Sequence, residues 1–217
     1  MSYTLYNYFR SSASWRVRIA LHWKELEYTY VPVHLVKEGG QQHGAEHRAR
    51  NPMEQVPVLE WEEAGQKRQL AQSLAILEFL ETRHAARPLL PRDPYLAGRA
   101  RMLAEIVNSG IQPFQNLTTL AKVRALGGDD KAFARGFIEA GLAAYDAAAA
   151  DVAGHFSVGD APSFADVCLV PQLNAARRFG VDLEAFSRLV EIEAHCAGLP
   201  AFDAAHADHQ PDTEVKP

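Results

Sequence analysis

Three prolines lie within residues 87–94, which read Arg87-Pro88-Leu89-Leu90-Pro91-Arg92-Asp93-Pro94. Proline has no backbone N–H and clashes with the preceding helical turn, so no continuous helix can cross this stretch. Before it, strand and helix patterns alternate, whereas only helical patterns follow it. The chain therefore divides into two predicted domains, residues 1–86 and 95–217, joined by a linker over residues 87–94.

The first predicted domain has the element order of a thioredoxin-like fold. Short apolar runs bounded by turn residues are typical of strands, and apolar residues recur at helical spacing between them. The predicted strands are Thr4–Tyr8, Glu27–Pro32, Val56–Trp61 and Lys67–Ala71, and the predicted helices are Ser14–Lys24 and Leu74–Arg83. This βαβ-ββα order predicts an α/β domain with a hairpin at its centre.

The second predicted domain is all-α and is expected to form a helical bundle. Its predicted helices are Tyr95–Val123, Asp130–Ala153, Phe164–Phe179 and Phe186–Ala197. A capping box at Ser163 and Asp166 marks the start of the third of these helices. The polar tail Ala207–Pro217 is expected to be loosely held.

Bulk composition excludes several classes of function. A formal net charge of −5 and a pI of about 6.0 make nucleic acid an unlikely partner. We expect no membrane helix and no export signal. Cys168 and Cys196 have no metal-binding or disulfide-type spacing, which fits a reducing cytoplasm. His206 and His209 lack a third ligand motif nearby, so no metal is expected.

A hydroxyl-rich turn, Ser11-Ser12-Ala13-Ser14, joins the first predicted strand to the first helix. The first turn of a helix leaves N–H groups unpaired and carries a partial positive charge, so it can bind an anion such as a thiolate. Serine is also a preferred helix cap. Capping and anion binding are therefore both open interpretations of this turn.

Two further motifs favour a bound peptide. The Val56-Pro57 step opens a strand where thioredoxin-like folds place a cis-proline, which would leave the Val56 backbone to pair with an extended peptide. Gln72-Ser73 is a polar pair at a helix start, suited to a ligand carboxylate. Together with the serine turn, these motifs describe a peptide whose carboxylate and sulfur lie at two different helix starts.

The chain resembles the zeta class of the glutathione transferases, which includes the maleylacetoacetate isomerases. The serine turn followed by Trp15-Arg16-Val17-Arg18-Ile19-Ala20-Leu21 is highly specific for this class. The resemblance covers nearly the whole chain. The other matching segments are residues 39–42, 51–57, 72–76, 110–113, 115–117, 158–160, 165–172 and 210–213.

The resemblance implies that glutathione is the cofactor. By position, Ser11 matches the catalytic serine that hydrogen-bonds the glutathione sulfur, and Ser12 completes the cradle. The other positions that match glutathione contacts are Gln42, Val56, Pro57, Gln72, Ser73, Gln112 and Asn116. The class usually has a cysteine where this chain has Ala13, so thiol chemistry at the turn would come from glutathione alone.

The arginines divide into two groups. Arg10 ends the first strand and resembles the arginine with which related isomerases grip a substrate carboxylate, a task suited to a planar guanidinium. Arg178, before Phe179, offers a second grip on a dicarboxylate or forms a surface ion pair. Arg16 and Arg18 lie inside a predicted helix and are expected to form ion pairs or reach solvent.

The resemblance implies glutathione-dependent cis–trans isomerisation of maleylacetoacetate in tyrosine and phenylalanine breakdown, by reversible thiolate addition to the cis double bond. It also implies a homodimer and a dicarboxylate substrate. Three alternatives stay open: a maleylpyruvate isomerase of gentisate breakdown, a general glutathione transferase or α-haloacid dehalogenase, and a glutathione-binding or ligand-binding protein without turnover.

Overall fold

The computed structural model describes residues 2–213, which form two compact units. The described part of the first unit is residues 2–88 and 200–213, and the second unit is Leu89–Leu199. The expected boundaries differ from these units at the C-terminus, because residues 200–213 pack with the first unit rather than with the helices before them.

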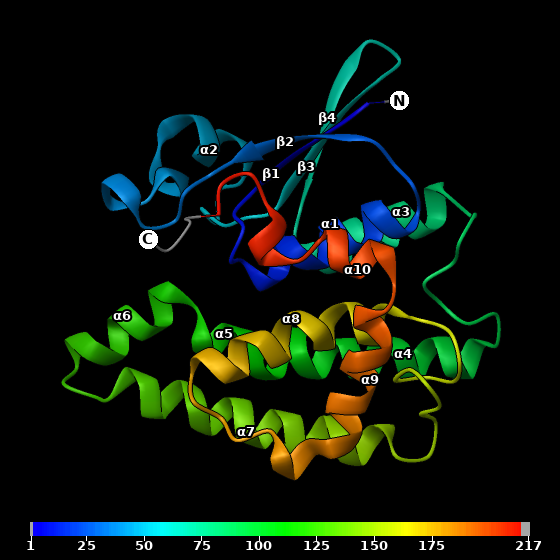
Figure 1. Cartoon of the computed structure of the whole chain (residues 1–217). Helices are drawn as coiled ribbons and strands as arrows, with labels where there is room; N and C mark the ends of the chain where they lie inside the picture. Colours follow the sequence, from blue (N-terminus) through cyan, green and yellow to red (C-terminus); the bar gives the residue numbers. More distant parts are fainter. Residues whose placement is uncertain (1, 214–217) are drawn as a thin grey trace. The chain divides into compact units, whose positions relative to one another are not determined.

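The first unit is built on a mixed four-stranded sheet with the strand order β2-β1-β3-β4. Its strands are β1 (Tyr3–Asn7), β2 (Tyr28–Pro32), β3 (Val58–Glu63) and β4 (Gln66–Ala71). β1 pairs parallel to β2 and antiparallel to β3, and β3 pairs antiparallel to β4. Helices α1 (Ser12–Trp23) and α3 (Ser73–Arg83) pack on one face of this sheet (Figure 1). A short helix, α2 (Ala45–Arg50), lies between β2 and β3 in the sequence. The predicted thioredoxin-like topology is confirmed.

The apolar core of the first unit lies between the sheet and these two helices. Leu5 of β1 and Leu59 of β3 are fully buried, as are Ile19 and Leu21 of α1 and Ile76 and Leu80 of α3. Trp61 of β3 stacks on Phe79 of α3, with ring centroids 4.4 Å apart. Stacking of this kind adds to the area that both rings bury, so it fixes α3 against the sheet.

Helix α1 also carries long cationic side chains into the interior. The expectation that Arg16 and Arg18 reach solvent is wrong, because both are fully buried. Lys24, near the end of the helix, forms an ion pair with Glu81 of α3 at 2.8 Å. A buried charge needs hydrogen bonds to offset its lost hydration, so these side chains mark positions where the interior is polar.

The second unit is helical, as predicted. Its longer helices are α4 (Pro94–Glu105), α6 (Leu117–Ala125), α7 (Asp130–Ala149), α8 (Phe164–Arg178) and α9 (Ser187–Ala197). The single helix expected over Tyr95–Val123 is wrong. A π-helical turn (Ile106–Ile111) and a short helix, α5 (Gln112–Gln115), follow α4. Asn116 then adopts an extended conformation before α6 begins. Pro113 contributes to the break because it supplies no N–H to the helical ladder.

The capping box at the start of α8 is confirmed. The Ser163 N–H and hydroxyl donate to Asp166 Oδ2 at 2.8 and 2.9 Å, and the Ser157 N–H donates to Oδ1 at 2.7 Å. Asp166 is fully buried, so its two oxygens satisfy groups that would otherwise lack water. This residue stabilises the fold of the second unit.

The C-terminal segment is folded rather than loosely held over residues 207–213. Helix α10 (Pro200–Ala204) packs against α1, and a 3-10 turn spans Ala207–His209 (Figure 1). Gln210 is buried and donates to the carbonyl oxygens of Ala204 and His206 at 2.9 and 2.7 Å. The expectation of a loose tail is therefore wrong for these residues, and residues 214–217 lie outside the described range.

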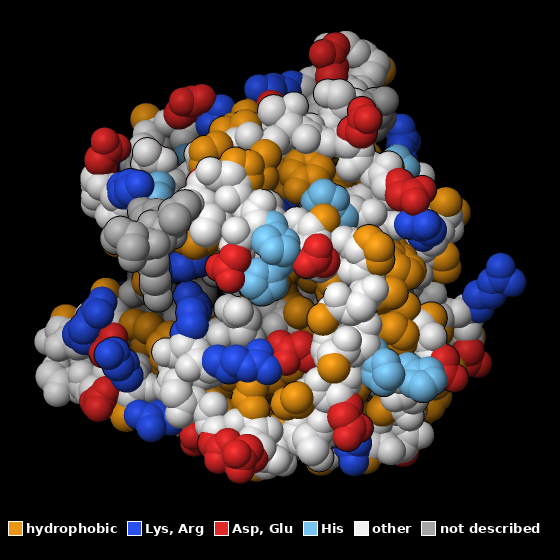
Figure 2. Space-filling model, viewed as in Figure 1, with side chains coloured by type: hydrophobic (Ala, Val, Ile, Leu, Met, Phe, Trp, Pro, Cys, Tyr) orange, Lys and Arg blue, Asp and Glu red, His pale blue; other side chains and the backbone are white. Residues whose placement is uncertain are grey.

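The surface carries charges of both signs. On the face drawn in Figure 2, Lys and Arg side chains are interspersed with Asp and Glu. Within residues 2–213, no helix has both the length and the hydropathy that crossing a bilayer requires.

Gly141 of α7 is expected to be required by packing. A Cβ added there would lie 2.2 Å from Cγ1 of Ile111, in the π-helical turn. Replacing Gly141 with alanine should lower the free energy of unfolding by about 1–3 kcal/mol, the usual cost of overpacking a core. Gly136 in the same helix has nothing within 4 Å of its added Cβ. Gly136→Ala should therefore raise stability by about 0.5–1 kcal/mol, since alanine favours helix. Urea titrations of both variants check the contrast, and equal effects would contradict it.

Candidate active site

Ser11 is the N-cap of α1, with extended backbone angles of φ −69° and ψ 115°. Its hydroxyl oxygen accepts a hydrogen bond from the Ser14 N–H at 3.2 Å, and its carbonyl accepts from the Trp15 N–H at 2.9 Å. The capping interpretation is therefore confirmed. A serine hydroxyl has two acceptor lone pairs and one proton, so the same oxygen can cap the helix and still donate to an anion. The two interpretations of the turn are compatible.

The rest of the first turn of α1 also suits an anion. The Ala13 N–H has no hydrogen-bonding partner among residues 2–213. Ser12 and Ser14 are buried beside it. The unpaired N–H lies at the positive end of the helix dipole, which favours negative charge.

The segment before β3 presents an unpaired backbone. The peptide bond between Val56 and Pro57 is cis, as the sequence predicts. Neither the N–H nor the C=O of Val56 has a hydrogen-bonding partner within residues 2–213. The preceding carbonyl, of Gln55, accepts from His47 Nε2 at 3.0 Å and from Asn51 Nδ2 at 2.9 Å. These two contacts fix the segment, so that the Val56 donor and acceptor have a defined place for an extended peptide.

The start of α3 is a second polar helix terminus. Gln72 precedes the helix with a φ of +71°, a conformation that costs a non-glycine residue of order 1–3 kcal/mol and is found most often at functional sites. Ser73 is buried, and its oxygen accepts from Nη1 of the buried Arg16 at 3.1 Å. With this acceptor position filled by a cation, the Ser73 hydroxyl proton can be donated to a ligand carboxylate.

Gln42 supplies a further open acceptor. Its side chain is buried, and Nε2 donates to the Leu35 carbonyl at 3.4 Å, while Oε1 has no partner among the described residues. Gly40 allows this arrangement, because a Cβ there would lie 2.5 Å from Gln42 Nε2. A buried amide oxygen without a donor is costly, so a ligand N–H at this position would satisfy it.

These groups fit a glutathione molecule. Glutathione has a thiol, two carboxylates, an amino group and two peptide bonds, and the first unit offers acceptors, donors and two helix starts for them. The groups concerned are the Ser11 and Ser73 hydroxyls, the Ala13 N–H, the Val56 backbone and Gln42 Oε1. Arg16, which donates to Ser73, was not identified as a site residue from the sequence. Its i, i+4 spacing from Ser12 places both residues on the same face of α1, which is a signal that could have found it.

Arg10 directly precedes the serine turn and is exposed. Its guanidinium carbon lies 5.7 Å from the centroid of the Phe9 ring. A guanidinium stacked on a ring keeps its hydrogen-bond donors at its edge, so it can still bind a carboxylate bidentately.

Three predicted site residues belong to the second unit and are described within it. Gln112 begins α5, Asn116 is the N-cap of α6, and Arg178 ends α8. Arg177, next to Arg178, pairs with both carboxylate oxygens of Glu193 in α9, one at 2.7 Å. Arg177 therefore forms an ion pair within the second unit.

The two histidines near the C-terminus have local roles. His206 Nδ1 accepts from the Asp208 N–H at 3.2 Å, and His209 Nδ1 bonds the Asp203 carbonyl at 2.8 Å. Within residues 2–213, no group of three His, Cys, Asp or Glu side chains is arranged to hold a metal ion.

Comparisons with known proteins also indicate a glutathione-binding protein. Residues 1–82 match the family described as glutathione S-transferase, N-terminal domain. The chain is 45% identical over 210 residues to a probable maleylacetoacetate isomerase 2 of Drosophila melanogaster, covering 96% of this chain and 89% of that protein.

Two solved structures are similar over almost their whole length. One is a maleylacetoacetate isomerase from Anaeromyxobacter dehalogenans 2CP-1 with glutathione bound in its active site, at 52% identity, a TM-score of 0.89 and 97% coverage of both chains. The other is a holo maleylpyruvate isomerase, described as a bacterial zeta-class glutathione S-transferase, at 39% identity and a TM-score of 0.90, covering 97% of this chain and all of that one.

Proposed function

We propose, since this chain belongs to the maleylacetoacetate isomerase family of zeta-class glutathione transferases, that it converts maleylacetoacetate to fumarylacetoacetate with glutathione as cofactor. The observation that carries this proposal is the position of Ser11 at the N-cap of α1, where its oxygen caps the helix while its proton can be donated. That arrangement suits a thiolate and needs no protein thiol.

The residues of the first unit divide the work of holding glutathione. Ser11 and Ser12 with the Ala13 N–H hold the sulfur, Gln72 and Ser73 hold the γ-glutamyl carboxylate, and the Val56 backbone pairs with the central peptide. Gln42 accepts a hydrogen bond from the glycine end of glutathione. In the second unit, Gln112 and Asn116 are assigned to glutathione by family position alone. When bound, glutathione supplies a thiolate that adds reversibly to the cis double bond and is released unchanged. Hydrogen bonds and the positive helix end lower the pKa of a thiol placed there.

The substrate is bound through its carboxylates. Arg10 lies beside the serine turn and offers a bidentate donor. In the second unit, we assign the second contact with a carboxylate to Arg178 by its family position, directly before Phe179.

Maleylpyruvate is the second candidate substrate. It presents the same cis double bond beside a carboxylate, and the similar maleylpyruvate isomerase structure favours it. The residues proposed for the first unit do not distinguish the two substrates, because they bind glutathione or, for Arg10, a carboxylate that both substrates carry.

The test is an assay of the purified protein on each substrate, with and without glutathione. We expect glutathione-dependent loss of the cis isomer, with the larger kcat/KM for maleylacetoacetate. A larger value for maleylpyruvate would reassign the substrate. Accumulation of a glutathione conjugate would favour a general transferase, and binding of glutathione without turnover would favour a ligand-binding protein.

We also propose a cytoplasmic homodimer, as the family resemblance implies. The two cysteines of the chain are buried thiols rather than a disulfide, which fits a reducing compartment. Sedimentation equilibrium should give twice the 24.0 kDa chain mass, and the single chain mass would contradict the dimer.

A further inference from the structure

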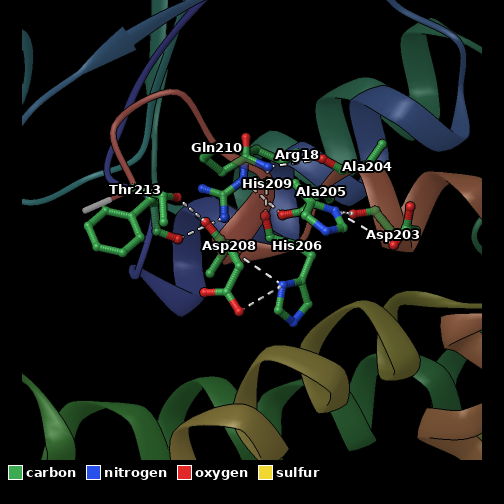
Figure 3. A network of polar contacts seen from close by, with 11 residues as sticks. Arg18, Asp203, Ala204, Ala205, His206, Asp208, His209, Gln210 and Thr213 are labelled. Atoms are coloured by element: carbon green, nitrogen blue, oxygen red, sulfur yellow. Dashed lines mark hydrogen bonds and ion pairs between the residues drawn. The ribbon is translucent and has the colours of Figure 1, made fainter. Parts of the chain in front are cut away.

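The C-terminal segment, Ala205–Thr213, lies against the strand–helix turn that leads to Ser11. Figure 3 shows Arg18 of α1 beside this segment, with its contact to Ala205 among the dashed lines. The segment is held together internally, since Thr213 Oγ1 donates to the Ala207 carbonyl at 2.6 Å and Gln210 donates to two carbonyls. The segment is therefore an ordered part of the first unit.

The peptide groups of Phe9 are held from two sides. The Phe9 N–H donates to Asp212 Oδ2 at 3.2 Å, a contact across 203 positions of the sequence. The Phe9 carbonyl accepts from Arg18 Nη2 at 2.9 Å. The N–H belongs to the Tyr8–Phe9 peptide group and the carbonyl to the Phe9–Arg10 peptide group. Neither peptide group can therefore rotate without breaking a charge-assisted hydrogen bond.

Arg18 also holds the start of the same turn. Its Nη1 donates to the Tyr8 carbonyl at 3.3 Å, the oxygen that accepts the Ser11 N–H at 3.0 Å. Arg18 Nη1 also donates to Asn7 Oδ1 at 3.0 Å, and Arg18 Nε donates to the Ala205 carbonyl at 3.2 Å. Burial lowers the pKa of Arg18 to about 10, which still leaves the guanidinium charged at neutral pH. This one side chain thus links the strand end, the turn and the C-terminal segment.

Asp212 is engaged through both carboxylate oxygens. Oδ1 accepts from the hydroxyl of Tyr30 in β2, and Oδ2 accepts from Phe9. Burial, followed by this hydrogen bond, raises the pKa of Tyr30, so the phenol stays protonated and keeps donating. Asp212 therefore ties the turn to the neighbouring strand β2.

We propose that Asp212 and Arg18 are positioning residues that hold the Tyr8–Ser11 turn, and with it the Ser11 hydroxyl, in the place where a thiolate binds. This inference rests on the proposed function of Ser11. Neither residue needs to touch glutathione, since each acts through the backbone of the turn.

Asp212→Ala tests the proposal by two measurements. The first is the pH dependence of the ultraviolet thiolate absorbance of bound glutathione, in which the apparent pKa of the thiol should rise by about one unit. The second is amide hydrogen exchange of the free protein, in which the Phe9 and Ser11 amides should exchange about tenfold faster or more. Asp212→Asn keeps an oxygen that can accept from Phe9, so it should recover part of both effects.

Asp208→Asn is the matched control, because it removes the same charge from the same segment. Asp208 is exposed, and its Oδ2 lies 3.7 Å from His206 Nδ1, within the C-terminal segment itself. It should leave the thiol pKa and the Phe9 exchange rate unchanged. If Asp212→Ala does not fold, Tyr30→Phe, which removes one donor to Asp212, should shift both readings in the same direction by a smaller amount.

A wild-type thiol pKa and wild-type exchange in the Asp212 variants would overturn the positioning role. If wild-type protein binds no glutathione thiolate, the proposed function fails instead, and the exchange rates still decide whether Asp212 holds the turn.

Discussion

Replacing Ser11 with alanine is expected to lower kcat about 100- to 1,000-fold, the usual loss when one hydrogen-bond donor to a developing or bound anion is removed. Glutathione should still bind, because the Val56 backbone, Gln42 and the start of α3 remain. The Michaelis constant for glutathione should therefore change much less than kcat. Steady-state kinetics at saturating glutathione measures both values.

A loss of activity could also come from the helix cap, since the Ser11 oxygen accepts from the Ser14 N–H. Replacing a serine cap with alanine costs about 1 kcal/mol of stability, whereas glycine costs only a few tenths. Ser11→Gly is therefore the matched variant. If the hydroxyl carries the activity, both variants lose kcat equally, although only the alanine variant unfolds at a clearly lower temperature. Activity in the glycine variant close to that of wild type would assign Ser11 to capping alone.

Replacing Arg10 with alanine is expected to lower kcat/KM for the dicarboxylate substrate about 30- to 150-fold. The estimate corresponds to about 2–3 kcal/mol, the range for a hydrogen bond to a charged group. Stability should hardly change, because Arg10 is exposed and its contact with the Phe9 ring is a cation–π contact worth about 0.5–1 kcal/mol. Arg10→Lys keeps the charge without the planar fork and should recover only part of the loss.

Arg68→Ala on β4 controls for the removal of one positive charge from the same unit. Arg68 is exposed and lies opposite Trp61 in the sheet register, away from the serine turn in the sequence. This variant should keep wild-type kcat/KM. Equal losses in the Arg10 and Arg68 variants would mean that Arg10 acts through general electrostatic attraction, and an unchanged Arg10 variant would remove it from the substrate site.

Much of the first unit could be predicted because its signals are local. Alternating strands, the helix start at the serine turn and the Val56-Pro57 step each depend on residues close in sequence. The expected strands and helices fall within a few residues of those found, and the start of α1 moves from Ser14 to Ser12 because Ser11, not a later serine, is the cap.

The failures concern contacts over long sequence separation. Polar residues near the C-terminus predict a loose tail, yet Asp212 accepts hydrogen bonds from Phe9 and Tyr30, which are far away in the sequence. Arg18 lies inside a helix, where a long cationic side chain usually reaches water. Its burial depends on carbonyl groups of residues 8, 9 and 205, which no periodicity reveals.

The second unit shows the limit of helical patterns. Apolar spacing continues from Tyr95 to Val123 and predicts one helix, but Pro113 and the extended Asn116 divide it. Gln112 and Asn116 lie at these breaks, so helical spacing gave them no position, and only the family resemblance assigned them to glutathione. The sequence also could not show that Arg177 pairs with Glu193, which lies 16 residues from it.

The most direct test of the central claim is to follow the cis and trans isomers of maleylacetoacetate by NMR in the presence of enzyme and a small, known amount of glutathione. If glutathione acts as a cofactor held at Ser11, many molecules of substrate are converted for each glutathione present, and all the glutathione is recovered. The loss of one glutathione for each molecule converted, or conversion no faster than without the enzyme, would contradict the account.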